Sequence, residues 1–257
     1  MRYFMELAYR GARYHGWQTQ PGEITVQSAI EDALAKLLRR QVKITGAGRT
    51  DTGVNASMMV AHLDLLDGEP LPGGIVRGIN AIVGRDIAVY GVTPVADDAH
   101  ARFDATSRTY HYYTHRIKSP FIHPLSWQAP PALDYEAMNR AAALLLDVAD
   151  FTSFAKLHSD SKTNICRVSR AEWIDAGDGR MVFVITADRF LRNMVRAVTG
   201  TLVDVGRGKL TIDDFAAVIA ARDRCAAGVS MPPEPLFLHS IQYPYYSPVG
   251  PSLQWAY

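Results

Sequence analysis

The stretch RYFMELAY, residues 2–9, roughly alternates between apolar and polar side chains and predicts a β-strand. Apolar residues then recur at helical spacing from Val26 to Leu38, and Thr25 is placed to cap that helix. Further patterns predict strands at 42–46, 57–66 and 87–95, with a helix marked by Ile75, Ile79, Ile82 and Val83 before the last strand. The order βαββαβ is that of a ferredoxin-like unit.

The remainder of the chain repeats this order. The patterns predict strands at 107–117, 165–175, 180–188 and 236–243, and helices at 134–148, 190–205 and near 212–222. We therefore expect an α+β protein of two ferredoxin-like (βαββαβ) halves, 1–104 and 105–257, joined through a mostly antiparallel central sheet. The proline-punctuated stretch from Pro120 to Pro131 predicts a surface loop.

Composition indicates an ordinary globular protein. Of its 257 residues 48% are hydrophobic and 21% charged, and no apolar run resembles a signal peptide or a membrane helix. The two cysteines, Cys166 and Cys225, form no CxxC pair, and the eight histidines form no HxH or HExxH cluster. We expect a cytoplasmic protein with no membrane contact and no metal site.

The net charge of +1 conceals an uneven distribution. Lys and Arg outnumber Asp and Glu by 8 to 5 in residues 1–60, by 4 to 1 in 101–120 and by 5 to 1 in 189–210. The intervals 61–100 and 121–150 are acidic, with 2 against 6 and 1 against 4. If folding gathers the three basic blocks, they form a face suited to nucleic acid; scattered solvated charge is the alternative.

The stretch GAGRTDTGVNA, residues 46–56, contains the tripeptide Asp51-Thr52-Gly53 found in aspartic proteases. Those enzymes need two such motifs to share one proton, and no second Asp-Thr-Gly or Asp-Ser-Gly occurs here. A plain glycine-rich turn capped by Asp51 is another interpretation. The third is an ionised catalytic carboxylate, which needs a nearby cation such as Arg49 or Arg196.

The motif GRTDTGV within that stretch resembles the catalytic motif of the bacterial tRNA pseudouridine synthase A family. The resemblance extends over about 240 residues because six further segments match that family in the correct order. They are YRGARYHGWQ (9–18), TVQ (25–27), RFDATSRTYHY (102–112), DFTSF (150–154), NMVRAVTG (193–200) and PLFLHSIQY (235–243). The chain departs from the family pattern at Arg10, Ala12, Asn55 and Pro235, and none of these positions is a catalytic candidate.

The resemblance implies a pseudouridine synthase fold and an isomerase that needs no cofactor or metal. It assigns Asp51 as the essential carboxylate, Tyr110 as the tyrosine that stacks on the flipped uracil, and Arg196 as the partner of Asp51. It also implies that Arg49 holds the vacated position or a phosphate, and that Leu236 is an apolar wall beside the base. From the residues alone, Tyr110 could equally be a packed strand tyrosine and Arg196 a solvated helix arginine.

The same resemblance implies a substrate and an assembly. The family modifies uridines at positions 38, 39 and 40 of the tRNA anticodon arm and acts as a homodimer. The alternatives are a non-catalytic RNA-binding protein of two ferredoxin-like units and a sister pseudouridine synthase with other RNA targets. The common RNA-recognition module carries the pattern Lys/Arg-Gly-Phe/Tyr-Gly/Ala-Phe, which this chain lacks.

Overall fold

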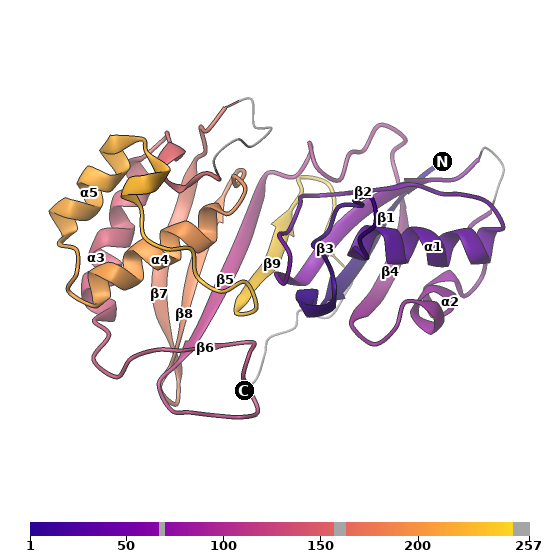
Figure 1. Cartoon of the computed structure of the whole chain (residues 1–257). Coiled ribbons are helices and arrows are strands. Elements are labelled where there is room, and N and C mark those ends of the chain that lie inside the picture. Colours follow the sequence, from indigo (N-terminus) through magenta and orange to yellow (C-terminus); the bar gives the residue numbers. More distant parts are fainter. Residues whose placement is uncertain (67–69, 157–162, 249–257) are drawn as a thin grey trace. The chain divides into compact units, whose positions relative to one another are not determined.

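The computed structural model describes residues 1–66, 70–156 and 163–248 (Figure 1). The chain divides into two compact units. The first contains Met1–Thr106 and the C-terminal segment from Leu238, and the second contains Ser107–Phe237. Both units combine helices with antiparallel strand pairs, so the expected α+β class is confirmed.

The first unit has the predicted element order. Its elements are β1 (Arg2–Tyr9), η1 (Gly11–Arg13), α1 (Val26–Leu38), β2 (Ile44–Gly46), β3 (Asn55–Asp64), α2 (Ile75–Ile82) and β4 (Ile87–Val95). Strand β1 lies between β3 and β4 and pairs antiparallel with both, while β2 pairs antiparallel with β3. The order of strands is β4-β1-β3, and β9 (Leu236–Gln242) follows on the other side of β3.

Helix α1 forms as its sequence predicts. The Thr25 hydroxyl accepts from the Ser28 backbone N–H, and the Ser28 hydroxyl accepts from the Thr25 N–H, which completes a capping box. Ile30 and Leu34 lie one turn apart and are almost fully buried. Burying each such side chain stabilises the fold by about 1.5–3 kcal/mol. Helices α1 and α2 contact each other and lie beside the sheet of the first unit (Figure 1).

The C-terminal segment packs onto the first unit through aromatic side chains. The rings of Tyr243 and Tyr246 lie 5.3 and 5.1 Å from the ring of Phe4, measured between centroids. The hydroxyl of Tyr246 also donates to the carboxylate of Glu6, which is fully buried on β1. These contacts explain why residues after Leu238 belong to this unit.

The second unit contains the remaining elements. They are β5 (Ser107–His115), β6 (Trp127–Gln128), α3 (Tyr135–Ala143), η2 (Leu144–Asp147), η3 (Thr152–Phe154), β7 (Val168–Gly177), β8 (Arg180–Ala187), α4 (Met194–Gly206), α5 (Ile212–Ala221) and η4 (Arg224–Ala226). Strand β8 lies between β5 and β7 and pairs antiparallel with both. Helix α3 contacts α4, α5 and β7, and the three helices gather beside this sheet (Figure 1).

Two predicted helix boundaries in the second unit are wrong. The helix predicted for 190–205 begins only at Met194, because Asn193 adopts a left-handed backbone conformation with φ 65° that interrupts any earlier helix. The helix predicted for 134–148 ends at Ala143 and tightens into a 3₁₀ turn. The predicted loop from Pro120 to Pro131 contains the short strand β6, which pairs in parallel with β5.

No described helix, in residues 1–66, 70–156 and 163–248, is long and apolar enough to span a membrane.

Candidate functional site

Asp51 lies in the first unit, on the loop that joins β2 to β3. The loop leaves the sheet after Ala47, whose N–H donates to the Val60 carbonyl at 2.8 Å. A turn then forms at its tip, where the Val54 N–H donates to the Asp51 carbonyl at 3.1 Å. Gly53 has φ 81° in this turn, a conformation that favours glycine. Asp51 is partly exposed, between the buried Thr50 and an exposed Thr52.

Arg49 is exposed on the same loop. Arg49 and Asp51 therefore lie on the same loop. The start of this loop is held by Trp17, which is 2% exposed. A side chain at Gly46 would place its Cβ 2.5 Å from the indole ring of Trp17, so only glycine lets the ring pack there.

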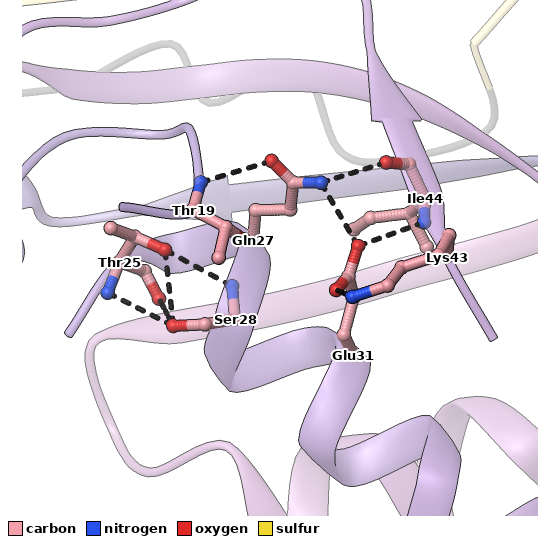
Figure 2. A network of polar contacts seen from close by, with 7 residues as sticks. All are labelled: Thr19, Thr25, Gln27, Ser28, Glu31, Lys43 and Ile44. Carbon is pink, nitrogen blue, oxygen red and sulfur yellow. Dashed lines mark hydrogen bonds and ion pairs between the residues drawn. The ribbon is translucent and has the colours of Figure 1, made fainter. Parts of the chain in front are cut away.

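A buried polar network fixes β2, the strand that leads into the Asp51 loop (Figure 2). Glu31 on α1 is 4% exposed, and its carboxylate accepts from the Lys43 Nζ at 2.7 Å and from the Ile44 N–H at 3.1 Å. The Gln27 Nε2 donates to both the Glu31 carboxylate and the Ile44 carbonyl, and the Gln27 Oε1 accepts from the Thr19 N–H. The network therefore joins α1 and β2 to the segment before α1.

Tyr110 lies in the second unit, on β5 opposite Ile185 of β8. Its side chain is 9% exposed, and the ring of Phe190 meets it edge-on with centroids 5.0 Å apart. Tyr112 is fully buried, and no hydrogen-bond partner for its hydroxyl lies among the described residues. Burial raises the pKa of the Tyr112 hydroxyl well above its usual value, so this group stays protonated.

Arg196 also lies in the second unit, on the first turns of α4, and is partly exposed. Its Nε donates to the Met231 carbonyl at 2.6 Å. Nearby, the Asn193 Nδ2 donates to the Ser230 hydroxyl at 2.6 Å, so the segment around Ser230 and Met231 supports the start of α4. Leu236 begins β9 and is 4% exposed.

The predicted site residues thus fall into two groups. Arg49 and Asp51 belong to the first unit, and Tyr110, Arg196 and Leu236 belong to the second. The pairing of Arg196 with Asp51 remains a prediction. Sequence patterns missed Met231, because it acts through a backbone carbonyl that every residue carries. Among the described residues no group of three or more His, Cys, Asp or Glu side chains is arranged to hold a metal ion.

Comparison with known proteins gives consistent matches. The family model described as "tRNA pseudouridine synthase" matches residues 141–244. The tRNA pseudouridine synthase A of Parabacteroides distasonis is 55% identical over 246 residues, which cover 95% of this chain and 96% of the relative. The corresponding proteins of Bacteroides fragilis and Chromobacterium violaceum are 52% and 40% identical; each match covers 95% of this chain, and 96% and 94% of the respective relative.

Proposed function

The chain belongs to the tRNA pseudouridine synthase A family, and from this premise we propose that it isomerises uridines at positions 38, 39 and 40 of the tRNA anticodon arm, with Asp51 as the essential carboxylate. Membership makes the protein an isomerase that forms pseudouridine in tRNA. In this reaction the bond between C1′ and N1 breaks, the uracil rotates, and C1′ bonds to C5. N1 gains a proton and C5 loses one, so substrate and product have the same atoms.

One observation carries the assignment of Asp51: it is partly exposed on a loop that is anchored by the buried Thr50 before it and the buried Gly53 after the exposed Thr52. Such a loop can present an anionic oxygen to a ribose while its backbone stays fixed. The carboxylate either attacks C1′ as a nucleophile or removes a proton from the ribose. Both roles need the ionised form and an oxygen placed close to the ribose.

The second unit supplies the groups proposed to receive the uridine. Taking a base out of its stack costs a few kcal/mol, and stacking on an aromatic ring returns about 1–3 kcal/mol. Tyr110 is the proposed stacking partner, and Leu236 is the proposed apolar wall beside the base. Arg196 is the proposed counter-charge of Asp51, held in orientation by its bond to Met231. Arg49, exposed beside Asp51, is proposed to hold the vacated position or a phosphate.

The proposed assembly is a homodimer that binds tRNA through the three basic blocks of the sequence. Contacts to phosphates position an RNA without reading its sequence, which suits an enzyme that acts on three neighbouring uridines. The proposed compartment is the cytoplasm, since Cys166 and Cys225 are both free thiols, as expected in a reducing environment.

Tritium release tests the assignment. tRNA labelled with tritium at uridine C5 is incubated with the wild type, with Asp51→Asn and with Asp32→Asn, a matched change at an exposed aspartate of α1. Isomerisation expels the label, so Asp51→Asn should release it at least about 1,000-fold more slowly while Asp32→Asn matches the wild type. Equal release by the wild type and Asp51→Asn would overturn the role of Asp51.

tRNA transcripts in which only one of positions 38, 39 and 40 is a uridine test which positions are modified. Release from all three supports the anticodon-arm proposal. Release only from uridines at other positions of the tRNA would instead indicate a sister pseudouridine synthase with other RNA targets.

A further inference from the structure

The residue before Asp51 is held at both its side chain and its backbone. Thr50 is 7% exposed, and its hydroxyl lies 2.8 Å from the hydroxyl of Tyr9 in a buried hydrogen bond. The Thr50 carbonyl accepts from the Trp17 N–H at 3.1 Å. The rings of Tyr9 and Trp17 pack together with centroids 6.0 Å apart. Thr50 and the peptide bond between Thr50 and Asp51 therefore have little freedom to move.

The far side of the loop is held by the same segment of chain. Asn55 is 1% exposed, and its Oδ1 accepts from the Gly11 N–H at 2.8 Å. A Cβ on Gly11 would lie 2.1 Å from the Val54 carbonyl oxygen, so the two backbones touch directly. Tyr9, the last residue of β1, and Gly11, the first residue of η1, thus hold the loop at Thr50 and at Asn55.

This arrangement matters because an aspartate side chain is short. Its carboxylate is two rotatable bonds from the backbone, so it moves with the backbone that carries it. A displacement of about 1 Å at a reacting group can cost about 100-fold in rate. Contacts that fix the backbone on both sides of Asp51 therefore affect the chemical step without touching the substrate.

We propose that Tyr9 is a positioning residue that acts on Asp51 through Thr50, and that Asn55 holds the other end of the loop. The proposal rests on the role proposed for Asp51. Tyr9 and Asn55 are buried, whereas Asp51 is partly exposed. Loss of either contact should therefore lower kcat and leave the binding of tRNA, and thus KM, nearly unchanged.

Two variants remove the same hydrogen bond from opposite ends. Tyr9→Phe keeps the ring against Trp17 and deletes the hydroxyl, and Thr50→Val deletes the partner hydroxyl. We expect each to lower kcat about 10-fold or more with KM within about 2-fold of wild type. The double variant should be no slower than the slower single variant, because both changes break one interaction. Thr50→Ser, which keeps the hydroxyl, should retain kcat close to that of the wild type.

A matched control separates positioning from general loss of packing. Tyr3→Phe removes a hydroxyl from another buried tyrosine of β1, one that donates to the Met1 sulfur and lies away from the loop. It should keep the kcat of the wild type and a thermal midpoint close to that of Tyr9→Phe. Asn55→Ala should again lower kcat rather than raise KM. Wild-type kcat in both Tyr9→Phe and Thr50→Val, or losses that multiply in the double variant, would overturn the proposal.

Asp51→Asn in the same assay tells the two proposals apart. If Asp51→Asn is inactive and both hydroxyl variants match the wild type, only the positioning role fails. If Asp51→Asn is active, the proposed role of Asp51 fails, and the positioning proposal fails with it.

Discussion

Arg196 and Met231 are joined by two hydrogen bonds: the Arg196 Nε donates to the Met231 carbonyl at 2.6 Å, and the Met231 N–H donates to the Arg196 carbonyl at 3.1 Å. The first bond uses Nε, the guanidinium nitrogen that is bonded to the aliphatic part of the side chain. Because the guanidinium is planar, fixing Nε also fixes the direction of the two terminal nitrogens. The backbone of the Met231 segment thus orients the group proposed to face Asp51.

Arg196→Lys should lower pseudouridine formation by about 100-fold despite keeping the positive charge. Lysine has no counterpart of Nε, so its ammonium cannot bond Met231 and keep the same direction. Initial rates of tritium release measure the effect, with Arg140→Lys as control, since Arg140 is an exposed arginine paired with Glu136 on α3. An Arg196→Lys enzyme as fast as the Arg140→Lys control would show that charge alone suffices.

Local patterns predicted most elements, because helices and strands follow from periodicity and capping. Thr25 was predicted as an N-cap and caps α1, and the strand predicted at 87–95 is β4 (Ile87–Val95). The start of α4 could not be predicted in this way, since the left-handed conformation of Asn193 depends on its surroundings in the fold. The hydrogen bond between Tyr9 and Thr50 spans 41 positions, and nothing in the sequence pairs those residues.

The candidate site residues are predicted for a different reason. Asp51, Tyr110 and Arg196 belong to motifs that resemble those of a known family, and their side chains differ chemically from their neighbours. Met231 and Gly11 act through backbone atoms, and side-chain motifs do not mark such contacts. The sequence therefore marks the groups proposed to do chemistry, but it does not show which contacts hold them, even where the contacting residues, such as Tyr9 and Thr50, lie within the same motifs.

Replacing Glu31 should cost more stability than replacing Lys43, although the two form an ion pair (Figure 2). Glu31→Leu leaves the buried N–H of Ile44 without its acceptor, which costs about 1–3 kcal/mol in the free energy of unfolding. Lys43→Met leaves Glu31 bonded to Ile44 and Gln27, and the Lys43 side chain is 76% exposed. The Lys43 end of the pair is exposed, and Glu31 keeps its two other hydrogen bonds, so this variant should lose less stability than Glu31→Leu.

Urea unfolding of both variants measures this difference. The two changes remove opposite ends of the same ion pair, so each serves as the control for the other. Equal losses would mean that the stabilisation lies in the ion pair itself rather than in the buried bond to Ile44.

The stability of the protein should fall as pH decreases below about 6.5, in part because of His62. Its side chain is 7% exposed, its Nδ1 accepts from the Ala101 N–H at 3.2 Å, and its ring lies 4.6 Å from that of His100. Burial, with smaller contributions from Arg2 and His100, lowers the pKa of His62 from 6.5 to about 4, against an opposing effect of Asp64 and Asp104. Burial also lowers the pKa of His100.

The sign of the pH effect follows from these pKa values. Above pH 6.5 His62 is neutral in both the folded and the unfolded chain, and it does not change the free energy of unfolding. Between pH 6.5 and about 4 the unfolded chain binds a proton that the folded chain does not, so the free energy of unfolding falls as pH falls. Below about pH 4 both states are protonated, and the loss from this residue levels off.

His62→Asn separates this contribution from those of other groups. The Asn Oδ1 lies about where the His Nδ1 lies, so it can still accept from Ala101, but it does not titrate. Urea unfolding at about pH 7 and about pH 4.5 should show a smaller loss of stability in the variant than in the wild type. Carboxylates that lie away from His62 titrate in both proteins and cancel in the comparison. An identical loss in the two proteins would assign the acid sensitivity to groups other than His62.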